Sequence, residues 1–92
     1  MNSGERVHHD VSLERMSQLM KWGQQDHAHL EWMAILMEEV GEAAKEALEH
    51  HWQGKHYPED PERLKRYRAE LIQVAAVAVA AVESLDRNEL KS

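Results

Sequence analysis

The segment Leu71–Val82 restricts what this chain can fold into more than any other part of the sequence. It consists of Leu, Ile, Val and Ala, with Gln73 as its one polar residue, so a helix formed here is apolar on every side. The segment is shorter than the ~20 apolar residues that a membrane-spanning helix needs, and other protein segments must therefore cover it. Three helices of a 92-residue chain can hardly enclose it, and we expect a partner subunit to complete the cover.

Length and composition both favour one small all-α domain, residues 1–92. Two prolines and four glycines are too few for a β-fold with many turns, and the frequent Ala, Leu, Met, Glu, Lys and Arg lose little on entering a helix. A lone domain of this size is only marginally stable, and no cysteine is present to add a disulfide or a thiolate metal site. We therefore expect a homodimer or a homotetramer.

The charge of the chain disfavours some partners and allows others. A formal net charge of −6 makes nucleic acid an unfavourable partner, although divalent cations would let an acidic protein bind a phosphorylated small molecule. Residues 1–10 are polar and lack the apolar core of a signal peptide. We expect a cytoplasmic protein that contacts no membrane.

Hydrophobic periodicity predicts three main helices. The first covers Glu5–Lys21, the second His29–His51, and the third starts with Asp60 as its cap and Pro61 at its first position and continues to residue 85 or 86. The second helix shows an apolar stripe that packs against a neighbour, at Leu30, Met33, Met37, Val40, Ala44 and Ala47. The third helix carries its own core stripe, at Leu64, Leu71, Ala78, Val82 and Leu85. A partner subunit would complete these helices into a four-helix-type bundle.

Closely spaced glutamates on the second helix suggest a cation site. Glu39 and Glu42 are one turn apart, as are Glu38 and Glu42, and such neighbours have Cβ atoms ~5–6 Å apart. Carboxylates this close repel each other unless a cation lies between them, and Mg²⁺ prefers hard oxygen ligands. A solvated acidic face explains most of these residues without a metal: Glu31, Glu38, Glu42 and Glu49. Glu39 differs, because it lies at the edge of the apolar arc.

Two polar residues of the third helix also need an explanation. Glu70 and Gln73 lie one turn apart on the side away from the predicted core stripe, and Val77 continues that side. They therefore point towards a second buried or cleft-facing surface, where an unpartnered amide costs ~1–3 kcal/mol and a lone carboxylate costs more. Either they form structural hydrogen bonds across the bundle, or they complete a metal cluster with Glu39 and Glu42.

The two motifs, in this order on successive helices, resemble the MazG-like all-α nucleoside triphosphate pyrophosphatases. That family carries Glu-Glu-x-x-Glu on one helix and Glu-x-x-Asp on the next, and the matching residues here are Glu38–Glu42 and Glu70–Gln73. The stretch Lys21–His27 and the sequences that flank both motifs are also similar to those of the short single-domain members of this family. The resemblance covers most of the chain between residues 21 and 87.

The resemblance implies Mg²⁺-dependent hydrolysis of nucleoside or deoxynucleoside triphosphates to monophosphate and pyrophosphate, in nucleotide-pool sanitising or control. Mn²⁺ is a possible substitute for Mg²⁺. Carried over by position, Glu39, Glu42 and Glu70 would be metal ligands, and Glu38 would be a further ligand or would orient the attacking water, so that Glu38 and Glu39 are the expected catalytic residues. Gln73 departs from the family's aspartate: its amide oxygen can ligate Mg²⁺ but carries no charge. This difference implies one of three outcomes: a lower metal affinity, the loss of one metal, or compensation by Glu38.

Substrate contacts are expected from the loop after the first helix. Trp22 either stacks on a nucleobase or packs on the rim of the bundle, and Gln25, Asp26 or His27 would read the edge of the base. Lys45, one turn beyond Glu42, either contacts phosphate or forms a surface salt bridge to Glu49. The alternative to an enzyme is a non-catalytic helical dimerisation or nucleotide-binding module, in which Leu71–Val82 is an interface and the glutamates are a solvated face.

Overall fold

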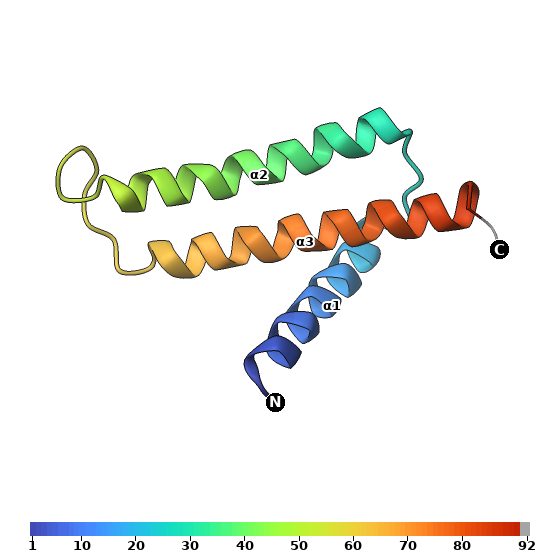
Figure 1. The fold of residues 1–92 in the computed structure, drawn as a ribbon, viewed down its shortest axis with the longest axis horizontal. Helices are drawn as coiled ribbons and strands as arrows, with labels where there is room; N and C mark the ends of the chain where they lie inside the picture. The colour runs from blue at the N-terminus through green and yellow to red at the C-terminus, as the bar shows by residue number, and fades with distance from the viewer. Residues whose placement is uncertain (91–92) are drawn as a thin grey trace.

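The computed structural model describes residues 1–90 and contains three helices, α1 (Ser3–Trp22), α2 (His29–His51) and α3 (Arg63–Asn88). Helices α2 and α3 run side by side as an antiparallel hairpin, and α1 crosses α3 obliquely (Figure 1). Helix α1 packs on α3 but not on α2. The described residues form no strand beyond a single bridge between Gln53 and Tyr57. The predicted all-α class is confirmed.

The helix ends follow from local chemistry. Gly23 ends α1 with a φ of 69°, and Gly54 turns the α2–α3 loop with a φ of 84°; glycine adopts both without strain. The predicted bounds of the second helix are confirmed. The predicted first helical position of the third helix is wrong, because Pro61 lies in a turn that precedes the helix. Asp60 caps this turn as predicted: its carboxylate accepts a hydrogen bond from the backbone N–H of Glu62 at 2.9 Å. Helix α3 therefore starts at Arg63.

The core lies between α2 and α3. Five apolar side chains are buried there: Trp32, Ala43, Ala76, Val77 and Ala80. Ile35, Leu36 and Ala81 pack around them. At the closed end of the hairpin the buried Arg63 guanidinium donates hydrogen bonds to Gln53 Oε1 at 3.2 Å and to the carbonyl of Pro58 at 3.1 Å. These contacts join the α2–α3 loop to the start of α3.

The predicted core stripes do not form the core of this chain. Most of their large apolar side chains are exposed, and we call the following set the outer face: Leu30, Met33, Met37, Val40, Leu64, Leu71 and Val82. Both helices contribute to it from the same side, because Met33 lines one shallow cavity together with Val82 and Leu85. The hairpin instead buries the side of α2 that carries Trp32 and Ala43. These stripes are therefore not the sides through which α2 and α3 pack on each other.

The single chain has more surface than a compact monomer. It exposes 6787 Å², whereas a compact monomer of 10.7 kDa exposes about 5,500 Å². Its radius of gyration is 15.5 Å, against about 12 Å for a compact domain of this length. Much of the apolar surface of α2 and α3 is therefore left uncovered by the chain's own helices.

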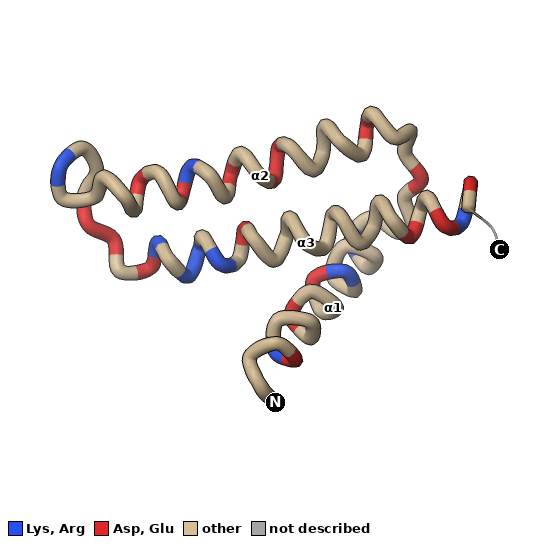
Figure 2. The backbone as a smooth tube through the Cα atoms, in the orientation of Figure 1, with Lys and Arg blue, Asp and Glu red and all other residues tan. Residues whose placement is uncertain are grey.

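Charged pairs hold α1 against α3. The Arg15 guanidinium lies 2.8 Å from Glu83 Oε1, and the Arg68 guanidinium lies 2.7 Å from Asp10 Oδ2. Basic residues gather at the beginning of α3, while acidic residues recur along α2 (Figure 2).

Within residues 1–90, no helix combines the length and the apolar character that crossing a membrane requires.

Candidate functional site

Three carboxylates from two helices converge between α2 and α3. Glu39 and Glu42 stand one turn apart on α2, and Glu70 reaches them from α3. Each offers one carboxylate oxygen, and these three oxygens lie within 4.8 Å of one another. Glu39 and Glu70 are half-buried, whereas Glu42 is exposed. The structure thus brings together three of the four residues predicted as metal ligands, and we call them the carboxylate triad.

The two half-buried members of the triad, Glu39 and Glu70, lack the basic partners that the half-buried glutamates further along α2 have. One turn beyond Glu42, the carboxylate of Glu46 lies 3.2 Å from the Arg66 Nε, and Glu49 lies 3.7 Å from the Arg63 guanidinium. No residue of the triad forms an ion pair within the part of the chain that the structure describes. Charge balance accounts for Glu46 and Glu49, and exposure to solvent accounts for Glu42, but neither accounts for the half-buried Glu39 and Glu70.

Burial and mutual repulsion act on the triad. Burial raises the pKa of Glu39 above its ordinary value, and the negative charges of Glu42 and Glu70 raise it further. Burial also raises the pKa of Glu70, and the adjacent Glu42 carboxylate adds to this effect. In Glu39 and in Glu70 the Oε2 atom is buried and has no hydrogen-bond partner within residues 1–90. The triad therefore concentrates negative charge that the described part of the chain does not compensate.

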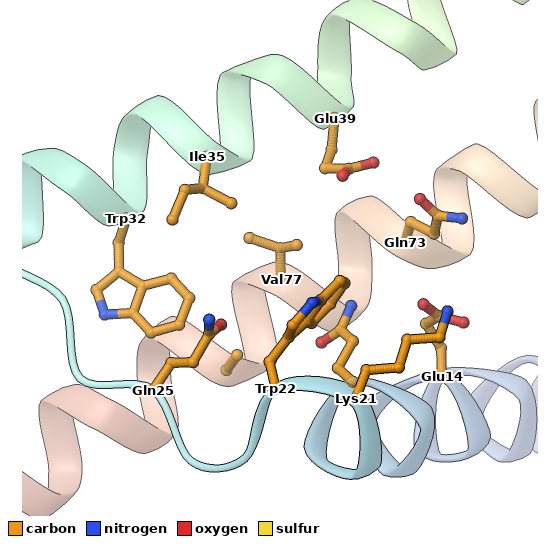
Figure 3. A pocket seen from close by; sticks show the side chains of 11 residues that line it. Glu14, Lys21, Trp22, Gln25, Trp32, Ile35, Glu39, Gln73 and Val77 are labelled. Carbon is orange, nitrogen blue, oxygen red and sulfur yellow. The ribbon is translucent and has the colours of Figure 1, made fainter.

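A cavity of about 310 Å³ lies beside the triad, between all three helices. Glu39 belongs to both the triad and the cavity wall. Gln73, one turn from Glu70 on α3, lines the cavity as well, so the fourth predicted metal ligand is next to the site. Figure 3 shows Glu39 and Gln73 at one end of this space and the indole of Trp32 at the other. The lining combines charged, amide and aromatic side chains.

Helix α1 supplies a wall of this cavity that the sequence analysis missed. Glu14, Gln18 and Lys21 line it from α1, and Lys21 is the only lysine or arginine among the lining residues (Figure 3). These residues recur at steps of four and three, which places them on one helical face. That spacing was a usable signal, but nothing in the sequence showed that this face turns towards α2 and α3.

The predicted substrate-binding loop divides into cavity residues and packing residues. Trp22 and Gln25 line the cavity, and Trp22 remains 61% exposed. His27 does not line it: its ring packs edge-on against Trp32, with centroids 4.8 Å apart. Two further predicted site residues, Glu38 and Lys45, are exposed and outside both the triad and the cavity wall. Their predicted roles stay predictions.

Asp26 anchors the loop that carries the cavity residues. Its Oδ1 atom accepts hydrogen bonds from Arg87 at 2.6 Å, from the Asn88 side-chain amide at 2.8 Å and from the Ser84 hydroxyl at 3.3 Å. The hydrogen bond from Arg87 is the main reason why the pKa of Asp26 lies well below its usual range, and those from Asn88 and Gln24 lower it further. Asp26 therefore joins the loop to the end of α3.

We predict that Asp26→Asn lowers thermal stability at neutral pH. A carboxyl whose pKa is depressed in the folded state stabilises the fold above its ordinary pKa of 3.8 and loses this contribution as the pH falls below it. The gap in melting temperature between wild type and variant should therefore narrow below about pH 4. Melting curves from pH 2.5 to 7 test this, with Asp86→Asn, an exposed aspartate of the same helix end, as the control. An equal gap at every pH would contradict the anchoring role.

Comparison of the chain with protein-family models, with curated proteins and with solved structures finds no match. The function of the site is therefore inferred from its own residues, together with the resemblance of its two motifs to the MazG-like family.

Proposed function

We propose that this chain is a Mg²⁺-dependent nucleoside triphosphate pyrophosphohydrolase, with Mn²⁺ as a possible substitute metal. One observation carries the proposal: three carboxylates that form no ion pair within residues 1–90 converge within 4.8 Å beside a cavity whose wall includes Glu39, a lysine and two tryptophans. A cation at the carboxylates and an aromatic, phosphorylated ligand in the cavity would satisfy every part of this arrangement. A role in nucleotide-pool sanitising or control follows from the resemblance to the MazG-like family.

The residues of the triad fit magnesium. All three donors are carboxylate oxygens, which are the hard ligands that Mg²⁺ prefers. The buried Oε2 atoms of Glu39 and Glu70 have no protein partner within residues 1–90, so both are free to coordinate a cation. When bound, Mg²⁺ would neutralise charge on the phosphates and lower the pKa of a coordinated water.

The reaction forms one bond and breaks one. Water adds its oxygen to the α-phosphorus of the substrate, the bond from that phosphorus to the bridging oxygen breaks, and pyrophosphate leaves with the electron pair. The proton of the attacking water passes to a carboxylate of the site that does not hold the metal, or to solvent.

The cavity suits a nucleotide in both size and lining. Its volume of about 310 Å³ lies at the lower end of the ~300–1,000 Å³ that small-molecule sites span. The indole of Trp22 offers a face on which a base can stack, and its exposure leaves that face accessible. Lys21 Nζ lies 5.8 Å from the centre of the Trp22 ring. A base on the indole and a phosphate at the ammonium would thus be neighbours.

We predict that Lys21→Ala raises the KM for a nucleoside triphosphate about tenfold, since a hydrogen bond to a charged group contributes about 1.5 kcal/mol. The value of kcat should change less, because the lysine is separate from the carboxylate triad. Steady-state kinetics of Lys21→Ala, Lys45→Ala and the exposed control Lys65→Ala provide the test. A rise in KM for Lys45→Ala but not for Lys21→Ala would assign the phosphate contact to α2.

The experiment that tests the proposed function is pyrophosphate release from a panel of ribo- and deoxynucleoside triphosphates, with Mg²⁺ and with chelator. We expect metal-dependent release of pyrophosphate together with the matching monophosphate. Release of orthophosphate would point to a different phosphohydrolase. If a folded oligomer releases neither pyrophosphate nor orthophosphate from any nucleotide of the panel, the result would favour a non-catalytic nucleotide-binding or dimerisation module.

We also propose that two copies of the chain associate through the outer face. The chain exposes about 1,300 Å² more than a compact monomer of its mass, and a stable interface buries about 800 Å² on each partner. The outer face consists of aliphatic and methionine side chains from both helices of the hairpin. Two hairpins joined there would form a four-helix bundle. Helix α1 also leaves apolar side chains exposed, which would permit a tetramer.

A further inference from the structure

Gln18 of α1 is a cavity residue whose carboxamide has a fixed orientation. It is half-buried and lines the central cavity. Its Oε1 atom accepts a hydrogen bond from the Arg15 Nη1 atom at 3.0 Å. A guanidinium has donors but no acceptor, so the oxygen of the amide, and not its nitrogen, must face Arg15. The Nε2 atom of Gln18 is accessible and donates no hydrogen bond within residues 1–90. Gln18 therefore offers a ligand donors only.

Arg15 is itself held in place from outside the central cavity. Its Nε and Nη2 atoms donate to Glu83 Oε1 at 2.9 and 2.8 Å, and its side chain is only 15% exposed. Arg15 and Glu83 line a separate cavity of about 580 Å³, which shares no lining residue with the central one. A chain of hydrogen bonds thus runs from Glu83 through Arg15 and ends at the wall of the central cavity. A reversal of the carboxamide would break this chain, because the amide nitrogen cannot accept from Arg15.

Two residues of the proposed nucleotide site lie one turn beyond Gln18. Lys21 and Trp22 follow it by three and four residues, so their side chains are its neighbours on the helix surface. All three line the central cavity, and Figure 3 shows the side chains of Lys21 and Trp22 extending from this end of α1 towards it. A nucleotide with its base on the indole and its phosphates at the ammonium would therefore bring acceptor oxygens within reach of Gln18.

We propose that Gln18 binds the nucleotide by donating a hydrogen bond from Nε2 to one of its acceptor oxygens, and that Arg15 positions the carboxamide for this contact. This inference rests on the proposed function of the same site. A side chain that is already ordered loses little entropy when the ligand binds, and a fixed donor discriminates an acceptor oxygen from a donor group. The acceptor is an oxygen of the phosphates or of the nucleoside, and the experiment below distinguishes the two.

The test is the affinity of the full-length chain for the α,β-imido analogue of UTP with Mg²⁺, measured by isothermal titration calorimetry. We expect Gln18→Ala to raise the Kd about five- to tenfold, as the loss of one hydrogen bond does. Gln18→Glu should raise the Kd further, because a carboxylate still accepts from Arg15 but repels the acceptor of the nucleotide. The control is Gln24→Ala, which removes an exposed glutamine outside the cavity wall and should leave the Kd unchanged.

Thermal melting separates ligand binding from a structural role of Gln18. A carboxylate pairs with Arg15 more strongly than an amide does, which offsets its repulsion from Glu14, so Gln18→Glu should melt close to the wild type although it binds the analogue more weakly. A Gln18→Glu variant that binds like the wild type would overturn the inference.

A double-mutant cycle tests the positioning role of Arg15. Arg15→Lys keeps the charge opposite Glu83 but lacks the fork that also reaches Gln18. It should weaken binding of the analogue in the wild-type background and have little further effect in the Gln18→Ala background, because Arg15 acts through Gln18. Equal effects of Arg15→Lys in the two backgrounds would contradict this role.

Inorganic triphosphate, as a second probe, identifies the acceptor. If Gln18→Ala weakens the binding of both probes equally, the acceptor is a phosphate oxygen; if it weakens only the nucleotide analogue, the acceptor belongs to the base or the sugar. Binding that depends on Gln18 without any pyrophosphate release from nucleotides would support the inference and overturn the proposed activity. Normal turnover with a Gln18→Ala variant that binds like the control would do the reverse. A wild type that binds neither probe would contradict both.

Discussion

Replacing Glu39 or Glu70 by glutamine should abolish Mg²⁺-dependent pyrophosphate release and at the same time raise the melting temperature of the metal-free chain. A metal bound at a phosphate contributes several kcal/mol to catalysis, and each 1.36 kcal/mol is a factor of ten in rate. Loss of a ligand should therefore lower kcat by about 10²–10³-fold or more. Glutamine keeps the size of the side chain, so the fold is preserved.

The gain in stability follows from the direction of the pKa shifts. Burial, together with the neighbouring carboxylates, raises the pKa of Glu39 and of Glu70 above the ordinary 4.5. The stability that such a group contributes to the fold is fully present below its ordinary pKa. This stability is lost as the pH rises through the folded-state pKa. At pH 7 in chelator, the wild type therefore carries a repulsion that the glutamine variants lack. Their melting temperatures should exceed that of the wild type by a few degrees at pH 7, and the difference should vanish near pH 4.5.

Metal should reverse the order of stability. Mg²⁺ that binds only the folded state stabilises it by RT ln(1 + [L]/Kd), or about 2.7 kcal/mol at 100 Kd. The melting temperature of the wild type should rise with Mg²⁺, whereas those of Glu39→Gln and Glu70→Gln should not. Melting curves with Mg²⁺ and with chelator, alongside pyrophosphate release, make the test, and Glu59→Gln is the control. Near-normal turnover in either triad variant would show that the site lies elsewhere.

The parts of the site that the sequence predicted are those set by spacing within one helix. Glu39 and Glu42 are one turn apart, and the helical repeat alone places their carboxylates close together. Glu70 reached the prediction differently, as a carboxylate one turn from Gln73 on the side of the third helix away from the predicted core stripe. Gly54 and Pro58 predicted the loop between the second and third helices, and the structure shows that α2 and α3 lie side by side on either side of it.

What the sequence could not predict is how the helices face one another. The stripe containing Met33 and Met37 is the more regular apolar pattern of α2, and periodicity alone therefore predicts it to be the core-facing side. The side that packs on α3 is interrupted by Glu39 and by Glu46, and these charges conceal the burial of Trp32 and Ala43. Periodicity defines the faces of a helix but not the neighbour that each face meets.

For the same reason, the sequence did not predict that α1 contributes a wall to the cavity. A helical wheel places Glu14 and Lys21 on one face, yet α1 contacts only α3, at an oblique angle. That angle depends on the turn at Gly23, on the Asp26 anchor and on the ion pairs of Arg15 and Arg68 with their partners. Contacts between residues this far apart in the chain have no signature in a single sequence.

A glutamate placed in the outer face should dissociate the dimer and destabilise each chain. Met37 is 58% exposed in the single chain, and in the proposed four-helix bundle it would be buried against the partner. A charge buried there without a counter-ion costs several kcal/mol, which is a large part of the ~5–15 kcal/mol that holds a domain folded. Met37→Glu should thus convert the protein to a 10.7 kDa monomer with a much lower melting temperature.

The control for this prediction is the same substitution on a surface that the dimer leaves free. Met20 on α1 is 86% exposed, and Met20→Glu should leave the association of two chains through the outer face intact. Light scattering coupled to size exclusion gives the mass, and thermal melting gives the stability. A wild type that is already monomeric, or a dimeric Met37→Glu, would contradict the assignment of the outer face.

The activity of a dissociated chain then separates two roles for the partner. Projected at ~100° per residue, Met37 and Glu39 point to opposite sides of α2, so the outer face and the triad do not share a surface. If Met37→Glu is monomeric, remains helical and still releases pyrophosphate below its melting temperature, the partner stabilises the hairpin without forming part of the site. If turnover disappears while Mn²⁺ binding persists, the second copy contributes to the substrate cavity, and the dimer is the catalytic unit.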